Sequence, residues 1–558
     1  MGVRPWGYAQ IMSLRSRAIG KLDGGSFDVL IVGGGINGAV AAAVLAGRGA
    51  SVALVDRGDF GSFTSQASSN LVWGGFKYLE GYELLLVRKL CVSRNRLITA
   101  YPDNIKPIPF LATLDETSPH PTWLATLGAS AYWAIGSFRT HPPRYMSAEK
   151  IEALEPIVNT EGSIGGIEYY DAYLTDNDSR FVFSFVRSAL DVGATAANYV
   201  EMVDAARDGD RWRVTLRDVD ADGEPFIATA KIVINAAGPF VDGLSGELGV
   251  TTTHRIVYSK GIHLVVPQLT PNHRVLAFYD DTQRLFYVIP MGRRSVIGTT
   301  DTRVDTPYTE VTDEDRDFLL EQINDRLDLP EPLTRDDIIA ERCGVRPLVV
   351  ERGTGDQADE DWTSLSRKHE IERDDDLAVV TVFGGKLTDC LNVGEEVAEE
   401  IEALGVSLEE DQGGWYGEPP EATRKDFYRQ ARLMKLDSLR TKPETEPLTD
   451  RLWRRYGRRA FDMLESIRAD RTMGEDVMGS ADYLRVELRN AAEHEMVVTL
   501  DDFMRRRSKI DLVVRDRDIV AGEGLREVAE ILFGDDAQRR LDAYLADKPS
   551  HRSRATPG

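Results

Sequence analysis

The residues best suited to chemistry begin at a glycine-rich turn near the start of the chain. The glycines of this turn fit the spacing GxGxxG at Gly33, Gly35 and Gly38. In such a turn the first glycine permits the bend, the second lets a pyrophosphate approach the backbone, and the third lets a helix pack closely. Asp56 ends the next apolar run, where a carboxylate accepts hydrogen bonds from a ribose diol. We therefore expect dinucleotide binding, with FAD or NAD favoured because the acid repels the 2′-phosphate of NADP.

Two later segments carry residues that suit a long cofactor. Residues 64–80 read TSQASSNLVWGGFKYLE, a hydroxyl-rich loop that leads into paired glycines. Ser and Thr hydroxyls bind phosphates and ribityl hydroxyls, and a glycine pair lets the backbone approach a flat ring. Residues 383–388, FGGKLT, form another strand that enters a glycine turn. Because these segments are far apart, an extended cofactor held by all of them is favoured over an isolated tight turn.

The elements that must position these residues follow from the apolar pattern. Residues 27–32, 39–46 and 51–56 predict a strand, a helix and a second strand, which together form a βαβ unit. Residues 255–310 alternate apolar and polar types, as in an antiparallel sheet. Residues 450–470 and 480–509 are strongly helical and predict a separate C-terminal unit.

Composition excludes several classes of protein. The 558 residues include 91 acidic and 67 basic side chains, for a net charge of −24, which repels a nucleic acid. The three cysteines, Cys91, Cys343 and Cys390, are far apart, so we expect no disulfide framework. The histidines form no paired spacing and neither CxxC nor HExxH occurs, so we expect no metal site. The N-terminus also lacks the apolar core of a secretory signal.

Taken in chain order, these motifs resemble the FAD-dependent glycerol-3-phosphate dehydrogenases, which are quinone-linked flavoenzymes related to α-glycerophosphate oxidase. The resemblance covers about residues 27–510. It is carried by GGGINGA (33–39), the block at 64–80, INAAGP (234–239), SKGIHLVVP (259–267), VIGTTDT (296–302), CGVRPL (343–348), FGGKLT (383–388) and TLDDFMRRRSK (499–509).

The resemblance implies an α/β chain with FAD as its cofactor. The implied domains are a basic N-terminal extension (1–26), a Rossmann-like FAD-binding domain (27–80, 165–250 and 345–405), an antiparallel-sheet substrate or cap domain (81–164 and 251–344), a linker (406–425) and a C-terminal helical domain (426–545). The implied FAD-binding residues are Gly33, Gly35, Asn37, Gly38, Asp56, Thr64, Ser65, Ser68, Ser69, Gly74, Gly75, Val200, Ala237, Gly238, Gly385, Leu387 and Thr388. We expect the FAD to be bound without a covalent link.

The resemblance also assigns the catalytic and substrate-binding groups. Arg346 would orient the substrate hydroxyl and stabilise developing oxyanion charge, while His263 would accept the hydroxyl proton as flavin N5 takes the hydride. A lone histidine in an apolar strand is otherwise more often a satisfied core residue. The implied substrate-binding residues, with Lys386 as the main phosphate ligand, are Lys386, Lys77, Tyr78, Thr300 and Asp301.

Four positions depart from the pattern of the family. Asn70, Trp73 and Lys77 stand where family members usually have Lys, His and Arg. Asp389 follows Thr388 where a Thr is common, so we expect it to add an acid near the pocket. Lys77 cannot bind phosphate through two parallel hydrogen bonds as an arginine does, and Trp73 replaces a polar histidine. These changes leave the identity of the substrate undecided. Oxidation of another polyol or polyol phosphate, such as a tetritol phosphate, is the alternative to glycerol 3-phosphate. A third hypothesis is a flavin-binding protein that has lost catalytic turnover. The sequence lacks the extra inserted segment of the related oxidases, which favours a dehydrogenase over an oxidase that uses oxygen.

A quinone acceptor would bring the protein to a membrane surface. We expect a cytoplasmic protein, peripheral on the inner face of the cell membrane, with a homodimer left open. Candidate membrane contacts are residues 1–22, the run Trp123–Phe138, Arg454 with Arg455, and Arg505 to Arg507. A frayed extension is the alternative for residues 1–22, and solvated helix faces are favoured for the arginines. The uncharged run 121–138 is diluted by Pro and Gly, so we expect no spanning helix.

Overall fold

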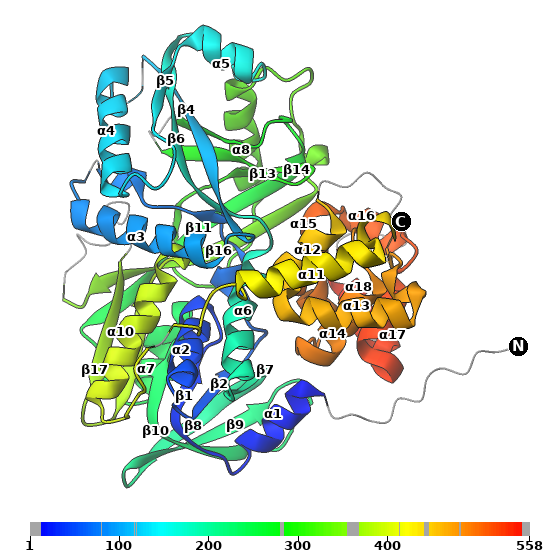
Figure 1. Cartoon of the computed structure of the whole chain (residues 1–558). Coiled ribbons are helices and arrows are strands. Elements are labelled where there is room, and N and C mark those ends of the chain that lie inside the picture. The colour runs from blue at the N-terminus through cyan, green and yellow to red at the C-terminus, as the bar shows by residue number, and fades with distance from the viewer. Residues whose placement is uncertain are drawn as a thin grey trace, which may run out of the picture.

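Two β-sheets and a cluster of helices make up the part of the chain that the structure, a computed structural model, describes (Figure 1). The described residues are 13–548 except 80, 117, 119, 222, 280–283, 354–367, 412, 440–445 and 479–480. The first sheet contains the predicted dinucleotide-binding segment, the second contains the predicted substrate-binding strands, and the C-terminal helices pack beside both.

The first sheet has the strand order β17-β18-β10-β1-β2-β7, with the β8–β9 hairpin joined to β10. Its strands are β1 (Ser26–Val32), β2 (Val52–Asp56), β7 (Thr195–Asn198), β8 (Val200–Asp208), β9 (Arg211–Asp218), β10 (Phe226–Asn235), β17 (His369–Asp374) and β18 (Val379–Gly384). The neighbours β18, β10, β1, β2 and β7 are parallel. Their carboxyl ends therefore meet at one edge, where an open α/β sheet binds its ligand.

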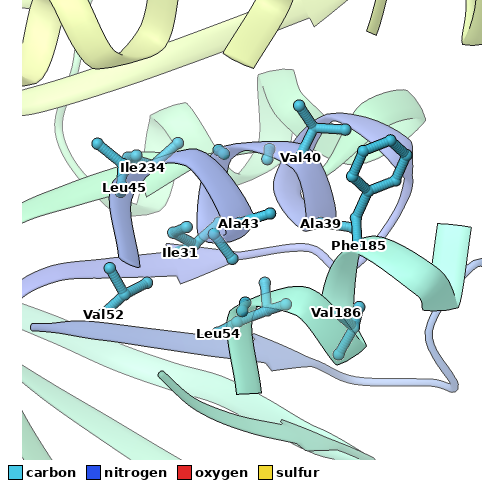
Figure 2. Close-up of a cluster of buried hydrophobic side chains, with 14 of the residues drawn as sticks. Ile31, Ala39, Val40, Ala43, Leu45, Val52, Leu54, Phe185, Val186 and Ile234 are labelled. Atoms are coloured by element: carbon cyan, nitrogen blue, oxygen red, sulfur yellow. The ribbon is translucent and has the colours of Figure 1, made fainter. Parts of the chain in front are cut away.

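Helices bury the faces of this parallel sheet, as such sheets require. The helices α2 (Ile36–Gly47) and α6 (Asp178–Asp191) lie against each other beside the strands (Figure 2). Ile31 and Leu54 of the sheet pack in one core with Val40 of α2 and Phe185 of α6, and all four side chains are fully buried. Each such side chain contributes about 1.5–3 kcal/mol to folding.

The second sheet has the order β15-β11-β14-β13-β12-β4-β6-β3, with β16 paired to β11 and β5 to β6. Its strands are β3 (Leu71–Val72), β4 (Ile105–Asp115), β5 (Arg144–Met146), β6 (Ser163–Leu174), β11 (His254–Pro267), β12 (Val275–Tyr279), β13 (Leu285–Met291), β14 (Arg294–Gly298), β15 (Thr302–Val304) and β16 (Ala340–Glu351). Its neighbours are antiparallel except for β12 with β4. The helices near this sheet are α3 (Leu84–Ala100), α4 (Thr122–Ile135), α5 (Ala148–Leu154) and α8 (Asp313–Arg326).

Three expected domain boundaries differ from the sheet topology, and in the shortest case residues 71–72 form β3 of the second sheet. Residues 165–174 and 345–351, which we assigned to the FAD-binding domain, belong to β6 and β16 of the second sheet. The reason is the length of the ladders, because β6 pairs with β4 from Ser163 to Leu174 and β16 pairs with β11 from Ala340 to Glu351. Neither strand can be divided between two sheets.

The C-terminal helices occupy one side of the molecule, coloured yellow to red in Figure 1. They are α11 (Glu421–Met434), α12 (Leu448–Tyr456), α13 (Ala460–Ala469), α14 (Arg485–His494), α15 (Ile510–Val513), α16 (Asp516–Ala521), α17 (Leu525–Phe533) and α18 (Ala537–Asp547). Trp453 and Leu464 are buried in one cluster of this region, and Leu488 and Phe503 in another. The preceding segment is also anchored, since Trp415 packs in the core of the first sheet.

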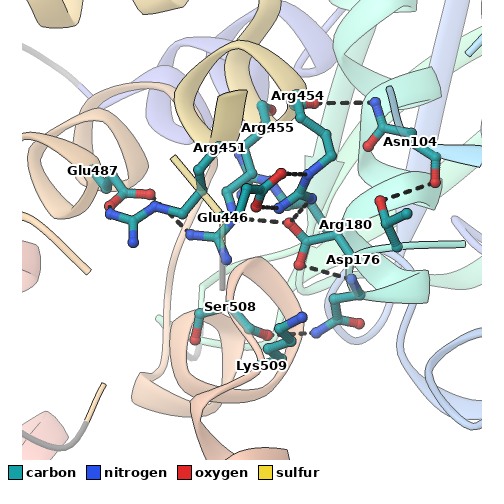
Figure 3. Close-up of polar contacts among 12 residues, drawn as sticks. Asn104, Asp176, Arg180, Glu446, Arg451, Arg454, Arg455, Glu487, Ser508 and Lys509 are labelled. Atoms are coloured by element: carbon teal, nitrogen blue, oxygen red, sulfur yellow. Dashed lines mark hydrogen bonds and ion pairs between the residues drawn. The ribbon is translucent and has the colours of Figure 1, made fainter. Parts of the chain in front are cut away.

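The prediction that the arginine clusters lie on solvated helix faces was wrong. Arg455 donates from Nε to Oδ2 of Asp176 at 2.7 Å, and Arg454 bonds the same oxygen at 2.5 Å (Figure 3). Although burial opposes its charge, Arg455 and Arg454 hold the pKa of Asp176 well below its usual value. Arg507 donates two hydrogen bonds of 2.8 Å to Asp59, and neither side chain is exposed. The carboxylates come from distant segments, so no local pattern marks these arginines as buried.

The described end of the N-terminal extension also differs from expectation. Helix α1 (Leu14–Leu22) packs against β7 and buries Leu22, while Arg15 pairs with Asp218 at 2.6 Å. This helix is neither frayed nor a free membrane segment, because its apolar face finds a partner within the fold. Residues 1–12 of the extension lie outside the described residues.

No helix of the described chain has the length and apolar character needed to cross a membrane. The uncharged run 121–138 forms α4, which has 14 residues. This result agrees with the expectation that the run is not a spanning segment.

Candidate active site

The glycine turn between β1 and α2 is held by Asp56. The backbone N–H of Gly34 donates to Oδ2 of Asp56 at 2.6 Å, and that of Gly58 donates to Oδ1 at 2.7 Å. Burial raises the pKa of this carboxyl group. Gly38 is required by packing, since a Cβ there would lie 1.8 Å from the carbonyl oxygen of Gly33. Asp56 thus orders the turn, and each of its oxygens keeps a second lone pair.

The predicted segments meet at the N-terminus of α2. Ser65 accepts a hydrogen bond on Oγ from the backbone N–H of Ile36 at 3.1 Å, at the end of a helix that attracts phosphate. Asn37 donates from Nδ2 to the carbonyl oxygen of Gly384 at 2.8 Å. Its Oδ1 is buried and has no hydrogen-bond partner among the described residues. The first glycine turn, the loop after residue 64 and the last glycine turn are therefore neighbours.

The hydroxyl-rich loop is anchored to the second sheet and to helix α6. Thr64 donates to the carbonyl oxygen of Val345 at 2.7 Å, and the N–H of Ser68 donates to Asp178 at 3.0 Å. Ser69 lines a small enclosed cavity that the loop shares with β6 and β13. Thr388 accepts a hydrogen bond on Oγ1 from the N–H of residue 73 at 3.0 Å, which ties this loop to the last glycine turn.

The glycine pair makes close contacts with protein side chains. A Cβ at Gly74 would lie 2.3 Å from the hydroxyl oxygen of Tyr132, and one at Gly75 would lie 2.6 Å from the ring of Tyr78. Gly75 also has a positive φ of 84°. Both positions therefore need glycine for packing and backbone shape, which is a different reason from the expected approach to a flat ring.

The remaining predicted cofactor residues lie at the ends of strands. Val200 is buried at the start of β8, and the N–H of Ala237 donates to Asn235 just after β10. Gly238 has a φ of +57° and open space where a Cβ would point. Gly385, with a φ of +98°, precedes Leu387 and Thr388 in the turn that begins α10 (Cys390–Ala403).

One face of the β11–β16 pair gathers the predicted catalytic groups. Ser259 lies opposite Arg346 and His263 opposite Arg342, and alternate residues of a strand share a face. Arg346 donates from Nη2 to Oγ1 of Thr299 at 2.6 Å and from Nη1 to Oδ1 of Asp301 at 3.2 Å.

Glycine and threonine complete the surroundings of this arginine. A Cβ at Gly261 would lie 2.2 Å from Nη2 of Arg346, so the guanidinium lies directly over this glycine. Thr300 offers its carbonyl oxygen to Arg346 at 3.1 Å, while its Oγ1 accepts from the N–H of Ile262 at 3.1 Å. The side chain of Thr300 therefore supports β11, and its backbone holds the arginine.

His263 is buried without a hydrogen-bond partner. Its side chain is 3% exposed, and neither Nδ1 nor Nε2 bonds to any described residue. Burial, together with the positive charges of Arg342 and Arg346, holds the pKa of His263 well below its usual value. The alternative of a satisfied core histidine is therefore wrong. A neutral imidazole has one bare ring nitrogen, and that nitrogen can accept a proton.

Lys386 and Tyr78 form the predicted phosphate-binding pair. Lys386 donates from Nζ to the hydroxyl of Tyr78 at 2.6 Å and lies 3.9 Å from the centre of its ring. The ring of Trp73 lies 5.8 Å from that of Tyr78, so the aromatic departure is part of the same cluster. Lys77 is exposed on the neighbouring 3-10 turn Phe76–Leu79, and its contact with substrate stays a prediction.

The expectation that Asp389 adds negative charge to the pocket was wrong. Oδ2 of this buried carboxylate lies 2.7 Å from Nδ1 of His369, whose Nε2 lies 2.8 Å from Glu396. Although burial opposes the charged imidazole, the two carboxylates raise the pKa of His369 to about 9. Asp389 is therefore half of a buried ion pair.

Sequence reasoning missed Arg342, which lies beside Asn70. Arg342 donates from Nη1 to Oδ1 of Asn70 at 2.5 Å. Asn70 stands where the family usually has a lysine, so a positive charge is still present here, but it is supplied by Arg342 of β16. Asn70 itself has a φ of +59°, a conformation that asparagine tolerates better than most residues. The signal was present in the sequence, because Arg342 and Arg346 are four residues apart in a strand and so share a face.

The fold and these residues have clear counterparts among known proteins. Residues 28–400 match the FAD dependent oxidoreductase family, and residues 430–540 match the C-terminal domain of alpha-glycerophosphate oxidase. The fold and the dinucleotide site are therefore those of a flavin-dependent oxidoreductase with an added helical domain, which confirms the predicted fold class and FAD.

Individual relatives narrow this class. The chain is 30% identical to glycerol-3-phosphate dehydrogenase 2 of Mycobacterium tuberculosis over 563 residues, which covers 95% of this chain and 90% of the relative. It is similar in structure to the glycerol-3-phosphate dehydrogenase of Bacillus halodurans complexed with FAD, with a TM-score of 0.70, 25% identity and coverage of 96% and 97%. The chain belongs to the FAD-dependent glycerol-3-phosphate dehydrogenase family. A D-erythritol 1-phosphate dehydrogenase of Brucella abortus is 29% identical and covers 86% of this chain and 94% of the relative.

Proposed function

We propose that the protein oxidises sn-glycerol 3-phosphate to dihydroxyacetone phosphate with bound FAD and passes the electrons to a quinone. One observation carries the proposal: the buried, neutral His263 lies on the same face of β11–β16 as Arg346, and neither ring nitrogen is hydrogen-bonded to a described residue. Oxidation of a secondary alcohol needs a base for the hydroxyl proton and an acceptor for the hydride. FAD supplies the hydride acceptor at flavin N5.

The residues at the carboxyl edge of the first sheet fit FAD. The N-terminus of α2 and Ser65 would hold the pyrophosphate, and the remaining lone pairs of Asp56 would accept hydrogen bonds from the ribose. The buried Oδ1 of Asn37 and the open space at Gly238 lie in segments that end at this edge. A bound FAD would supply a hydrogen-bond donor to Oδ1 of Asn37 and would fill the space beside Gly238.

Arg346 and His263 would act on the hydroxyl that is oxidised. The guanidinium of Arg346 is fixed by Thr299 and Asp301, so it can orient the substrate oxygen and stabilise negative charge on it. His263 would take the proton at a ring nitrogen. Because its pKa lies well below the usual value, the base is ready at neutral pH and in mild acid.

Lys386 would bind the phosphate of the substrate as a point charge. Its hydrogen bond to Tyr78 helps to position the ammonium group, whose positive charge suits phosphate oxygens. The exposed Lys77 could add a second cation from the neighbouring turn. These positive groups account for anion binding by a chain whose net charge is −24.

A longer polyol phosphate is the second candidate substrate. Trp73 packs in the cluster of Tyr78, and Asn70 replaces a lysine of the family pattern, so the pocket differs from that pattern in shape. The relative from Brucella abortus, named D-erythritol 1-phosphate dehydrogenase, supports this candidate. Comparing D-erythritol 1-phosphate with sn-glycerol 3-phosphate in the same assay separates the two.

An exposed apolar patch supports delivery of electrons at a membrane. The patch is formed by α3, α4 and the residues beside them, which adjoin in the fold (Figure 1). Its members are Tyr82, Leu84, Leu85, Trp123, Leu124, Leu127 and Phe138, with Leu85 88% and Trp123 67% exposed. Arg88 and Arg139 are exposed beside them, and residues 117–148 contain no acidic side chain. Glu83 lies between Tyr82 and Leu84, so Arg88 and Arg139 adjoin the patch without surrounding it. Apolar side chains with adjoining cations fit an anionic lipid surface, where a quinone is held.

The proposal is tested by anaerobic flavin reduction in variants of the site. Lys386→Met should raise the sn-glycerol 3-phosphate concentration needed for half-maximal reduction, because it removes a phosphate contact. His263→Asn should lower the limiting rate by about 100-fold or more, because it removes the base. Lys425→Met, which changes an exposed lysine of α11, serves as the control. Equal kinetics in all four proteins would contradict the assignment.

A further inference from the structure

Arg342 is a buried cation whose hydrogen bonds are incomplete. Its side chain is 1% exposed, and Nη1 donates to the carbonyl oxygen of Ser68 at 2.6 Å and to Asn70. Nε and Nη2 have no hydrogen-bond partner among the described residues. The carboxylate of Asp178 is 4.0 Å away. Because a buried guanidinium with unused donors is costly, an arrangement that retains one needs a reason other than stability.

The position of Arg342 gives that reason. It is directly opposite His263 in the β11–β16 ladder, and both side chains are on the same face of the sheet. Arg346 projects from this face four residues further along β16, but Asp301 partly offsets its charge at 3.2 Å. From β14, Gly298 packs against the ring of His263 and carries no charge. Among these neighbours, Arg342 is the less compensated cation.

Removing Arg342 would change two things at once. Its guanidinium joins the loop at Ser68 and Asn70 to β16, so it fixes the loop against this strand. Its charge also disfavours a second positive charge on the neighbouring imidazole. A base that became protonated at neutral pH could not accept the proton of the substrate hydroxyl.

We propose that Arg342 is a positioning residue of the active site, which holds the Ser68–Asn70 loop against β16 and keeps His263 in its neutral, proton-accepting form. The inference rests on the proposed function for its meaning in catalysis. The effect of Arg342 on His263 can nevertheless be tested separately, because the protonation of His263 can be observed without any substrate.

The first test follows the protonation of His263 in the FAD-loaded protein. Histidine-labelled protein is titrated by NMR, and the signal of His263 is assigned by its loss in His263→Asn. In the wild type the imidazole should stay neutral through mild acid, whereas in Arg342→Met it should titrate roughly one pH unit or more higher. Arg342→Lys keeps the charge and should retain most of the wild-type behaviour.

A buried arginine outside the site provides the control. Arg451 is 4% exposed and donates to Glu487 in the C-terminal helices, so Arg451→Met should leave the titration of His263 unchanged. If Arg342→Met leaves the His263 titration where it is in the wild type, the inference is overturned. It is also overturned if Arg342→Lys shifts the titration as far as Arg342→Met does.

The second test follows the pH dependence of anaerobic flavin reduction. In Arg342→Met the rate should fall on the acid side at a higher pH than in the wild type, because protonated His263 is inactive. An acid limb that does not move contradicts the inference. If sn-glycerol 3-phosphate reduces none of the proteins, the proposed function fails, while the NMR titration still decides the relation between Arg342 and His263.

Discussion

Asn37 donates a hydrogen bond from Nδ2 to the carbonyl oxygen of Gly384 at 2.8 Å, and so joins residues 347 positions apart in the sequence. Asn37 lies in the first turn of α2, directly after the glycine turn of the dinucleotide motif, and Gly384 ends β18 at the start of the last glycine turn. A Cβ at Gly385 would lie 3.3 Å from Oδ1 of the same asparagine. One side chain therefore sets the distance between the two turns that we propose hold FAD.

Asn37→Ala should weaken FAD binding more than it weakens the fold elsewhere. The change leaves the carbonyl oxygen of Gly384 without its donor in a buried place, which costs about 1–3 kcal/mol. FAD dissociation measured by flavin fluorescence should rise by about 10-fold or more. Asn324→Ala is the matched control, because Asn324 also bonds a backbone carbonyl, that of Leu333, but in the second-sheet region. Equal FAD loss in both variants would contradict the account.

Asp59→Asn should loosen the junction between the first sheet and the C-terminal helices. Asp59 accepts hydrogen bonds from Arg506 and Arg507 and is fully buried in this cluster. Arg507 loses its charged partner, while Arg506 keeps its ion pair with Asp502. The uncompensated buried charge should cost about 3–5 kcal/mol, visible as a lower melting temperature in calorimetry.

The control for this change is an exposed ion pair. Asp313 pairs with Arg316 at 2.7 Å but its side chain is 60% exposed, so Asp313→Asn should cost less than about 1 kcal/mol. A melting temperature for Asp59→Asn that matches the Asp313→Asn value would show that the buried cluster does not hold the junction.

The stability of the protein should fall in mild alkali because of His369. Asp389 and Glu396 raise its pKa to about 9, above the ordinary value of 6.5. A raised folded-state pKa contributes stability that is fully present below about pH 6.5 and is lost as pH rises through about 9. The melting temperature should therefore drop over this range, and His369→Gln should remove that part of the drop.

His254→Gln is the comparison for this experiment. Its imidazole also lies 2.7 Å from a carboxylate, that of Glu372, but outside the Asp389 cluster. This variant should keep the alkaline drop of the wild type. A drop that persists unchanged in His369→Gln would place its origin elsewhere.

Membrane attachment should depend on the apolar patch. Leu85→Ser combined with Trp123→Ser should weaken binding to vesicles of equal phosphatidylglycerol and phosphatidylcholine by about tenfold or more, since each side chain contributes about 1.5–3 kcal/mol when buried. Flotation with the vesicles measures the bound fraction. Leu433→Ser, at a 79% exposed position of α11, should bind as the wild type does. Loss of binding in this control but not in the double variant would place the contact on the C-terminal helices.

The sequence predicts the parts of the molecule that local pattern determines. The glycine spacing from Gly33 to Gly38 and the acid at Asp56 follow from backbone geometry, and the structure has both in the expected turn. The βαβ unit around them follows from short apolar runs. Such features need no knowledge of distant segments.

The rest depends on contacts between distant segments. The sequence suggests that Asp389 adds charge to the pocket, but the structure pairs it with His369 at 2.7 Å. The sequence likewise suggests that Arg455 is exposed, but the structure pairs it with Asp176. Arg342 has no marked motif, and its importance comes from its register opposite His263. The spacing of Arg342 and Arg346 shows that they share a strand face, but the sequence does not show that His263 lies opposite Arg342, because such long-range pairing is fixed by the packing of the domains.

The most direct test of the proposed function is anaerobic mixing of the FAD-loaded protein with sn-glycerol 3-phosphate while the visible absorbance of the flavin is followed. The account predicts rapid bleaching, with the absorbance restored by a soluble quinone analogue. D-erythritol 1-phosphate and unphosphorylated glycerol, added separately, define the substrate. A flavin that stays oxidised with sn-glycerol 3-phosphate and bleaches with another polyol would contradict the assigned substrate. A flavin that none of these compounds reduces would contradict the proposed oxidation altogether.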